Sequence, residues 1–176
     1  MPPRWLLLAA ALTAAAATAR AAVTVISEAP SDDVRLRRAT LEARRYLYEL
    51  SGELPALSGP TELWTPSSTP RVLIANADRL AHIRPSLADA AGSPPPPTEA
   101  GSHFVQLVHL RGAAASATAQ PVIVCSGVDS AATLFAVYTM LEALGVRFRN
   151  HGDIIPRTNY GKVAICIKID EFCIKK

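Results

Sequence analysis

The stretch Ser126–Pro156, with the sequence SGVDSAATLFAVYTMLEALGVRFRNHGDIIP, decides the fold because it combines the densest hydrophobic pattern in the chain with the clearest helix signals. Asp129 and Ser130 predict the start of a helix, since their side-chain oxygens can accept hydrogen bonds from the free N–H groups of a first turn. Gly145 predicts its end, because glycine readily adopts the left-handed conformation found there. Val146–Phe148 then alternates like a short strand. A strand, a buried helix and a second strand are therefore expected.

One face of this predicted helix carries apolar residues at the helical spacing i, i+3, i+4, i+7. They are Ala131, Leu134, Phe135, Tyr138 and Leu141. We therefore expect Phe135, Tyr138 and Leu141 to belong to the core. The remaining surface of the helix is also mostly apolar, so the helix is expected to be buried on more than one side.

A second helix is predicted upstream, over Val34–Leu50, with Gly52 ending it and Asp32 and Asp33 as its caps. Its apolar face comprises Leu36, Thr40, Ala43, Leu47 and Leu50, with Arg and Glu opposite. Apolar runs rich in β-branched residues predict further strands. These runs are Ala22–Ser27, Arg71–Ala75, His103–Leu110 and Pro121–Cys125.

The connecting segments have less regular patterns. Leu80–Ile83 predicts a weak helical turn, and Gly92–Gly101 is a proline-rich loop that is expected to be exposed. Gly112–Gln120 reads as a hairpin-like connection of small residues. Together the elements predict an α+β domain, with a mixed sheet of about five strands and two principal helices packed on it. A chain of 176 residues has room for one such domain, which we place at residues 22–156.

The N-terminal residues 1–21 read as a signal peptide. Arg4 is followed by the apolar run Trp5–Ala17 and by the small residues of Ala19–Ala21, which suit a cleavage site. We therefore expect a secreted, extracellular protein with no membrane span after cleavage. A retained membrane anchor and an organellar transit peptide are the alternatives.

Charge and cysteine content exclude some functions. Charged residues are 19% of the chain and the formal net charge is +3, so no nucleic-acid partner is expected. The arginines of the first helix are read as its solvated face, with a patch for an anionic partner as the alternative. Cys125 lies in an apolar run and is expected to be a small buried residue, whereas Cys166 and Cys173 are free to pair or to stay reduced.

No arrangement of residues predicts a metal site. His103 and His109 are six residues apart in one strand, about 20 Å at roughly 3.3 Å per residue, and so cannot share an ion. His82 and His151 sit in predicted loops without a carboxylate or thiolate at ligand spacing. We expect no metal ligand and no cofactor.

No arrangement predicts catalysis either, because no carboxylates stand out as the pair that a glycoside hydrolase needs. Asp32, Asp33 and Asp129 are explained as caps, and Glu42, Glu49 and Glu142 as polar helix surface. The remaining candidates are Glu28, Glu53 and Asp153. Ser126-Gly127 lacks the G-x-S-x-G context of a nucleophilic serine. An anion held at the helix start near Gly127 is the one alternative considered. We therefore expect no catalytic residue.

Several motifs nevertheless resemble a known accessory domain. They are Ala43–Leu54 (ARRYLYELSGEL), Thr133–Tyr138 (TLFAVY), Leu144–Phe148 (LGVRF) and Asp153–Pro156 (DIIP). They are similar to the N-terminal domain of α-glucuronidase-type glycoside hydrolases of families 67 and 115, and to the related second domain of family 20 β-hexosaminidases. The resemblance covers roughly Val23 to Pro156 and implies a β-hexosaminidase domain-2-like fold. Phe148 and Ala132 depart from the usual Trp and Gly of the pattern.

The resemblance implies a function without implying active-site residues. In the resembling enzymes the catalytic groups lie on a barrel that follows this domain, and residues 157–176 form an atypical tail with no barrel strand. The implied protein is a non-catalytic, truncated N-terminal domain of a secreted carbohydrate-active hydrolase, with the barrel as its partner and carbohydrate as a further possible one. The alternative is a small secreted glycan- or protein-binding module. Whether the chain is an enzyme stays open, and we expect it to be inactive alone.

Overall fold

The computed structural model describes residues 23–27, 32–64, 69–87, 98–110 and 120–156. Within these ranges the chain forms an α+β fold with a mixed five-stranded sheet, which confirms the predicted fold class. The elements in chain order are β1 (Thr24–Ser27), α2 (Val34–Ser51), β2 (Ala56–Ser58), the 3-10 helix η1 (Pro60–Trp64), β3 (Arg71–Asn76), α3 (Ala77–Leu87), β4 (His103–Leu110), β5 (Gln120–Gly127) and α4 (Ser130–Ala143).

The strands lie in the order β2-β1-β3-β5-β4. β1 pairs in parallel with β2 and β3, β3 pairs in parallel with β5, and β4 is antiparallel to β5 at the edge. Central β3 is buried from Arg71 to Ala75, in agreement with the interior strand predicted there. A parallel strand buried on both faces needs a continuous apolar run, and the sequence RVLIA largely supplies one.

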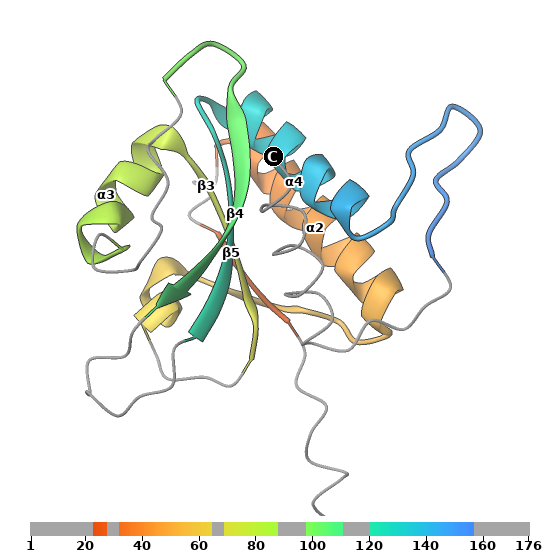
Figure 1. Cartoon of the computed structure of the whole chain (residues 1–176), viewed down its shortest axis with the longest axis horizontal. Coiled ribbons are helices and arrows are strands. Elements are labelled where there is room, and N and C mark those ends of the chain that lie inside the picture. Colours follow the sequence, from red (N-terminus) through yellow and green to blue (C-terminus); the bar gives the residue numbers. More distant parts are fainter. Residues whose placement is uncertain (1–22, 28–31, 65–68, 88–97, 111–119, 157–176) are drawn as a thin grey trace, which may run out of the picture.

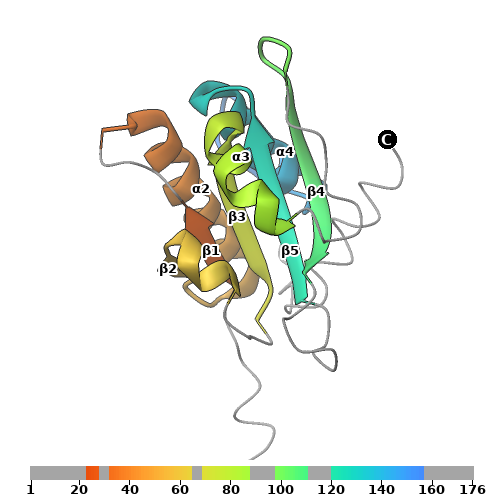
Figure 2. The ribbon, with the colours of Figure 1, turned by 90° about the vertical axis from the view of Figure 1, so that its left-hand side faces the viewer.

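Helices cover both faces of the sheet, so the domain has three layers. Figure 1 shows α2 and α4 side by side on one face and α3 on the other, and Figure 2 looks onto α3 lying over β3 and β5. Alternation along β3 divides the core accordingly. Val72 and Ile74 pack toward α2 and α4, whereas Leu73 and Ala75 pack toward α3 and η1.

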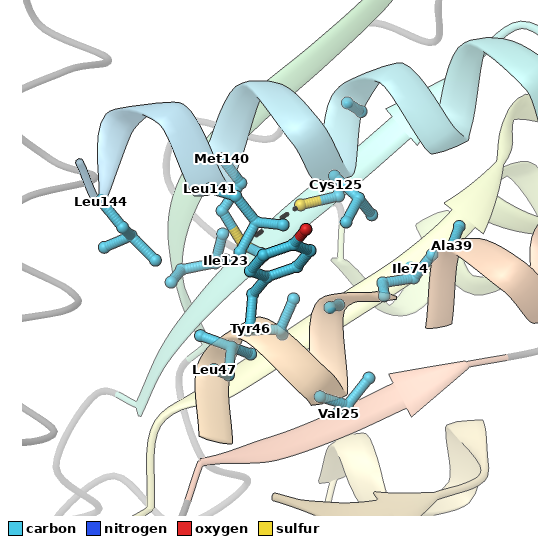
Figure 3. Close-up of a cluster of buried hydrophobic side chains, with 14 of the residues drawn as sticks. Val25, Ala39, Tyr46, Leu47, Ile74, Ile123, Cys125, Met140, Leu141 and Leu144 are labelled. Carbon is cyan, nitrogen blue, oxygen red and sulfur yellow. Dashed lines mark hydrogen bonds between the residues drawn. The ribbon is translucent and has the colours of Figure 1, made fainter. Parts of the chain in front are cut away.

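The larger of the two cores lies between the sheet and the helices α2 and α4 (Figure 3). Cys125 is fully buried there as a thiol outside any disulfide, and its Sγ donates to Sδ of Met140 at 3.6 Å. The prediction of Cys125 as a small buried residue is confirmed. Burying each large aliphatic side chain contributes about 1.5–3 kcal/mol, so this core is the main source of stability for the helix pair.

The prediction for α2 is confirmed in its face and in its end. All five residues of the predicted apolar face are buried: Leu36, Thr40, Ala43, Leu47 and Leu50. The Asp33 carboxylate accepts a hydrogen bond from the Leu36 N–H at 2.9 Å. Gly52 ends the helix with φ 73°, in the left-handed region that glycine tolerates best.

The ends of α4 are also as predicted, but its buried face agrees with the prediction only in part. Asp129 caps the helix, and the N–H of Val146 bonds to the carbonyl of Leu141 around Gly145, whose φ is 97°. The prediction of Phe135 as a core residue is wrong, because its side chain is 59% exposed. Leu141 is buried as predicted and Tyr138 is partly buried, and the other buried residues of α4 are Ala132, Thr133, Ala136, Val137 and Met140. Because the helix is apolar nearly all round, its periodicity could not select one face.

Two further elements differ from the predictions. The fifth strand is the short edge strand β2, and Val146–Phe148 is not part of the sheet. Between the end of α4 and Pro156 the described chain forms an isolated antiparallel bridge between Arg147 and Ile154, and the Phe148 ring packs against side chains of α2 and α4. The weak turn predicted at Leu80–Ile83 is part of the longer helix α3.

Some predictions lie outside the described residues. These concern the signal peptide at 1–21, the tail at 157–176 with Cys166 and Cys173, Glu28, most of the proline-rich loop and the connection before Gln120. Among the helices that the structure does describe, none combines the length and the apolar character needed to cross a membrane.

Candidate functional site

A surface cleft of about 530 Å³ opens where α2 and α4 meet the segment that follows α4. Clefts that bind small molecules typically measure about 300–1,000 Å³ and combine apolar walls with a few polar groups. The lining residues are Arg38, Glu42, Arg45, Tyr46, Tyr138, Glu142, Phe148 and Asp153. This cleft is the best candidate for a functional site in the described part of the chain.

The two helices present their lining residues at helical spacing. Arg38, Glu42 and Arg45 follow the i, i+4, i+7 pattern on one side of α2, and Tyr138 and Glu142 are four residues apart on α4. The third side is built by the chain after Gly145, where the bridge between Arg147 and Ile154 folds the segment back. This reversal brings Phe148 and Asp153 to the helices.

Phe148 forms the aromatic wall of the cleft together with two tyrosines. Its ring centroid lies 5.5 Å from that of Tyr46 at an interplanar angle of 89°, and 4.9 Å from that of Tyr138 at 69°. Both are edge-to-face arrangements, each contributing about 0.5–1.5 kcal/mol beyond area burial. Phe148 therefore fastens the segment after α4 to both helices.

The tyrosine hydroxyls are held in their neutral form. The Tyr46 hydroxyl donates a hydrogen bond to the Asp153 carboxylate, and burial followed by this bond raises the pKa of Tyr46 above its ordinary value. Burial, followed by the negative charge of Glu42, also raises the pKa of Tyr138. Near neutral pH both phenols are hydrogen-bond donors, so neither is suited to act as a base or nucleophile.

The charged residues of the cleft nearly balance. Two arginines, Arg38 and Arg45, stand against three carboxylates, Glu42, Glu142 and Asp153, which leaves one net negative charge. Nε of Arg38 lies 3.6 Å from Oε1 of Glu42. The Arg45 guanidinium pairs with Glu49 at 3.0 Å and lies 5.1 Å from the centre of the Tyr46 ring. Carboxylates of α2 therefore lie beside both arginines and offset part of their positive charge.

A second, shallower depression of about 300 Å³ adjoins the cleft on the outer side of α2. It shares Arg38, Glu42 and Arg45 with the cleft, and adds Val34, Arg37 and Leu41. Val34 is 64% exposed and Leu41 is 53% exposed. The outer surface of α2 is thus more apolar than the solvated face predicted from its arginines.

The histidines considered from the sequence do not come together. His103 and His109 are exposed on β4, and the His103 ring contacts the Thr139 hydroxyl at 3.2 Å and lies beside Phe135. His82 is on α3 rather than in a loop, and His151 is exposed after α4. No group of three or more potential metal ligands occurs among the residues that the structure describes.

Four of the carboxylates considered as a catalytic pair, Asp33, Glu42, Glu49 and Asp129, have structural partners. Asp33 and Asp129 are confirmed as caps, whereas Asp32 lies exposed in the preceding turn. Asp33 also accepts a hydrogen bond from the Ser130 hydroxyl, which joins the first turns of α2 and α4. Glu42 and Glu49 lie on α2 beside arginines.

The strand end before α4 is tightly packed. A Cβ atom on Gly127 would lie 2.3 Å from the backbone carbon of Ala132, so the strand approaches the first turn of the helix directly. The Asp129 carboxylate accepts the Ala132 N–H at 2.7 Å. A carboxylate of the protein therefore occupies the place that a bound anion would take. Adjacent Ser126 is fully buried, and its hydroxyl has no hydrogen-bond partner within the described ranges.

The sequence did not reveal the cleft as a unit. Arg38, Glu42 and Arg45 are predicted as helix surface and Tyr138 as core, while Asp153 has no predicted role. The helical spacing of the α2 and α4 residues is the only local signal. The contact that completes the cleft joins Tyr46 to a residue 107 positions away, which no local pattern encodes.

Comparisons with protein-family models and with curated proteins find no match to this sequence.

Proposed function

We propose that this chain is the non-catalytic N-terminal accessory domain of a secreted carbohydrate-active glycoside hydrolase. The proposal rests on the resemblance of Ala43–Leu54 and Ser126–Pro156 to that class of domain. The α+β sheet with its paired helices α2 and α4 is compatible with the implied architecture. Residues 1–21 support secretion, because their pattern is that of a signal peptide.

The absence of catalysis is supported by the structural use of three of the described carboxylates. Glycoside hydrolysis requires two carboxyl groups about 5–10 Å apart, one of them free to exchange a proton. Here Asp33 and Asp129 cap helices and Asp153 accepts the Tyr46 hydroxyl. Carboxylates that serve as caps or structural acceptors are poor general acids, because their hydrogen bonds favour the charged form.

The outer side of α2 supports a role as a domain that packs on a partner. Val34, Leu41 and Tyr48 follow one another at seven-residue spacing and are 64%, 53% and 47% exposed. Residues seven apart lie on the same side of a helix after about two turns. A row of exposed apolar residues along one side of a helix is compatible with a contact surface, and a following barrel is the partner that the resemblance implies.

The test is an activity assay of the purified chain on aryl glucuronides and aryl hexosaminides. No turnover above background is expected. Turnover that disappears in Glu142→Gln or Asp153→Asn, with folding retained, would overturn the proposal. Sequencing transcripts beyond the codon for Pro156 adds a second readout, since a reading frame that continues into a barrel is expected.

The cleft supports a second candidate function, a secreted glycan- or protein-binding module without enzymatic activity. Its size, its aromatic wall and its balanced polar groups are those of a binding site. A folded chain that binds a ligand at the cleft is expected in this case, whereas the accessory-domain proposal alone requires no ligand.

A further inference from the structure

We propose that the cleft between α2, α4 and the segment after α4 binds a neutral carbohydrate. The inference rests on the second proposed function and names the chemical class of ligand that the site would take. It concerns binding by the chain itself, and so does not depend on whether a catalytic barrel follows.

The charge of the cleft favours an uncharged ligand. The one net negative charge of its lining disfavours anions, and the positions of Glu142 and Asp153 place two carboxylates at its rim. Cations are disfavoured by Arg38 and Arg45, which face the same space. Arg38 lies beside Glu42 and Arg45 pairs with Glu49, so nearby carboxylates already offset part of the charge with which the arginines would attract an anion.

The polar lining also disfavours a purely apolar ligand. Such a ligand would remove water from guanidinium and carboxylate groups without replacing their hydrogen bonds, which is unfavourable for each group left unpaired. Hydroxyl groups both donate and accept, so an array of ligand hydroxyls can satisfy the acceptors of Glu142 and the donors of Arg38 together. A ligand rich in hydroxyls matches this mixed lining.

The aromatic wall of the cleft matches the apolar C–H face of a sugar ring. Tyr138 and Phe148 are half-buried, so part of each ring remains accessible at the cleft. The C–H face of a pyranose is apolar and packs on aromatic surface, whereas its rim of hydroxyls is polar. A pyranose against Tyr138 and Phe148 would place its hydroxyls toward the charged rim.

The cleft is also held in shape without a ligand. The Tyr46–Asp153 hydrogen bond and the two edge-to-face contacts of Phe148 fix the segment after α4 against both helices. A wall that is ordered in advance lowers the entropic cost of binding.

The test is a titration of the ¹⁵N-labelled full chain, followed by ¹H–¹⁵N NMR spectra. The neutral probes are xylohexaose, cellohexaose and chitohexaose, and the anionic probe is hexagalacturonate. We expect saturable shifts from at least one neutral probe at amides around Arg38, Tyr138 and Phe148. Hexagalacturonate is expected to bind at least tenfold more weakly.

Matched variants assign the binding to the cleft. Tyr138→Ala is expected to weaken binding of the neutral probe about tenfold, and Tyr48→Ala, which removes an exposed tyrosine of α2 outside the cleft lining, less than twofold. Glu142→Gln provides a second cleft variant on an exposed position, expected to weaken binding several-fold without affecting the fold. Equal effects of Tyr138→Ala and Tyr48→Ala would overturn the assignment.

The outcomes separate this inference from the function on which it rests. If hexagalacturonate alone saturates the cleft, the neutral-carbohydrate inference is overturned. The proposed function as a binding module is then retained. If a folded chain gives no saturable shift with any probe, the neutral-carbohydrate inference is overturned. If the cleft also fails to retain protein partners in cross-linking from the secreted fraction, the binding-module function fails with it.

Discussion

The hydroxyl of Tyr46 on α2 donates a hydrogen bond to the carboxylate of Asp153, which lies 107 residues later in the chain. The bond ties the segment after α4 to the first long helix and closes one side of the cleft. Tyr46 is only 2% exposed, whereas Asp153 is exposed at the rim of the cleft, so the bond joins a buried side chain to a surface carboxylate.

Tyr46→Phe is therefore expected to lower the free energy of unfolding by about 1.5–3 kcal/mol, the usual value for a hydrogen bond to a charged group. The ring and its contact with Phe148 are retained, so the change isolates the hydroxyl. Urea denaturation at pH 7 measures it. Tyr48→Phe is the matched control and should change stability by less than about 0.5 kcal/mol, because Tyr48 is exposed. Equal effects of both variants would contradict a role for the Tyr46–Asp153 bond.

The raised pKa of Tyr46 also predicts that the free energy of unfolding falls at alkaline pH. Its folded pKa lies above the ordinary value of 10.0, because of burial and the bond to Asp153. Below pH 10 both folded and unfolded states keep the proton, so the stabilisation is fully present. As pH rises above 10, the unfolded state releases its proton first and the stabilisation is lost, by at most about 1.4 kcal/mol per pH unit.

Wild type should therefore lose stability more steeply than Tyr46→Phe between pH 10 and 12. Urea denaturation at intervals of half a pH unit measures both slopes. Tyr48→Phe should keep the slope of wild type. Parallel curves for wild type and Tyr46→Phe would show that Tyr46 does not titrate differently in the two states.

Gly127 predicts a steric effect at the junction of β5 and α4. A Cβ there would lie 2.3 Å from the backbone carbon of Ala132 and 2.4 Å from the backbone nitrogen of Thr133. Gly127→Ala should cost about 3 kcal/mol or more, because backbone atoms of the helix must move. A Cβ on Gly59 would meet nothing within 4 Å, so Gly59→Ala should change stability by less than about 1 kcal/mol. Thermal unfolding followed by circular dichroism compares them, and similar melting temperatures for both variants would contradict the close approach.

The parts of the fold that could be predicted are those encoded by local pattern. α2 was predictable because one apolar stripe from Leu36 to Leu50 is buried and most of the residues that face away are charged. The ends of α4 were predictable from Asp129 and Gly145, but its buried face was not, since Phe135 and the truly buried Val137 look alike in an apolar helix.

The parts that could not be predicted depend on neighbours distant in the sequence. β2 has only three residues, two of them exposed, and is a strand because β1 offers an edge to pair with. The cleft required knowledge that Asp153 returns to Tyr46 and that Phe148 packs between two tyrosines. Packing of this kind is decided by the tertiary fold, so a single sequence does not reveal which surface residues share a site.

Ser126 provides the last prediction, since its fully buried hydroxyl has no hydrogen-bond partner within the part of the chain that the structure describes. A buried unpaired hydroxyl costs about 1–3 kcal/mol in desolvation, so Ser126→Ala should leave stability unchanged or raise it by about 1 kcal/mol. Thr133→Val is the matched comparison, because the Thr133 hydroxyl donates to the Asp129 carbonyl at 2.8 Å and accepts the Gly127 N–H at 3.2 Å. It should lower stability by about 1–3 kcal/mol. Urea denaturation measures the free energy of unfolding of both variants. If Ser126→Ala loses as much stability as Thr133→Val, the serine hydroxyl is hydrogen-bonded in solution, for example to a buried water.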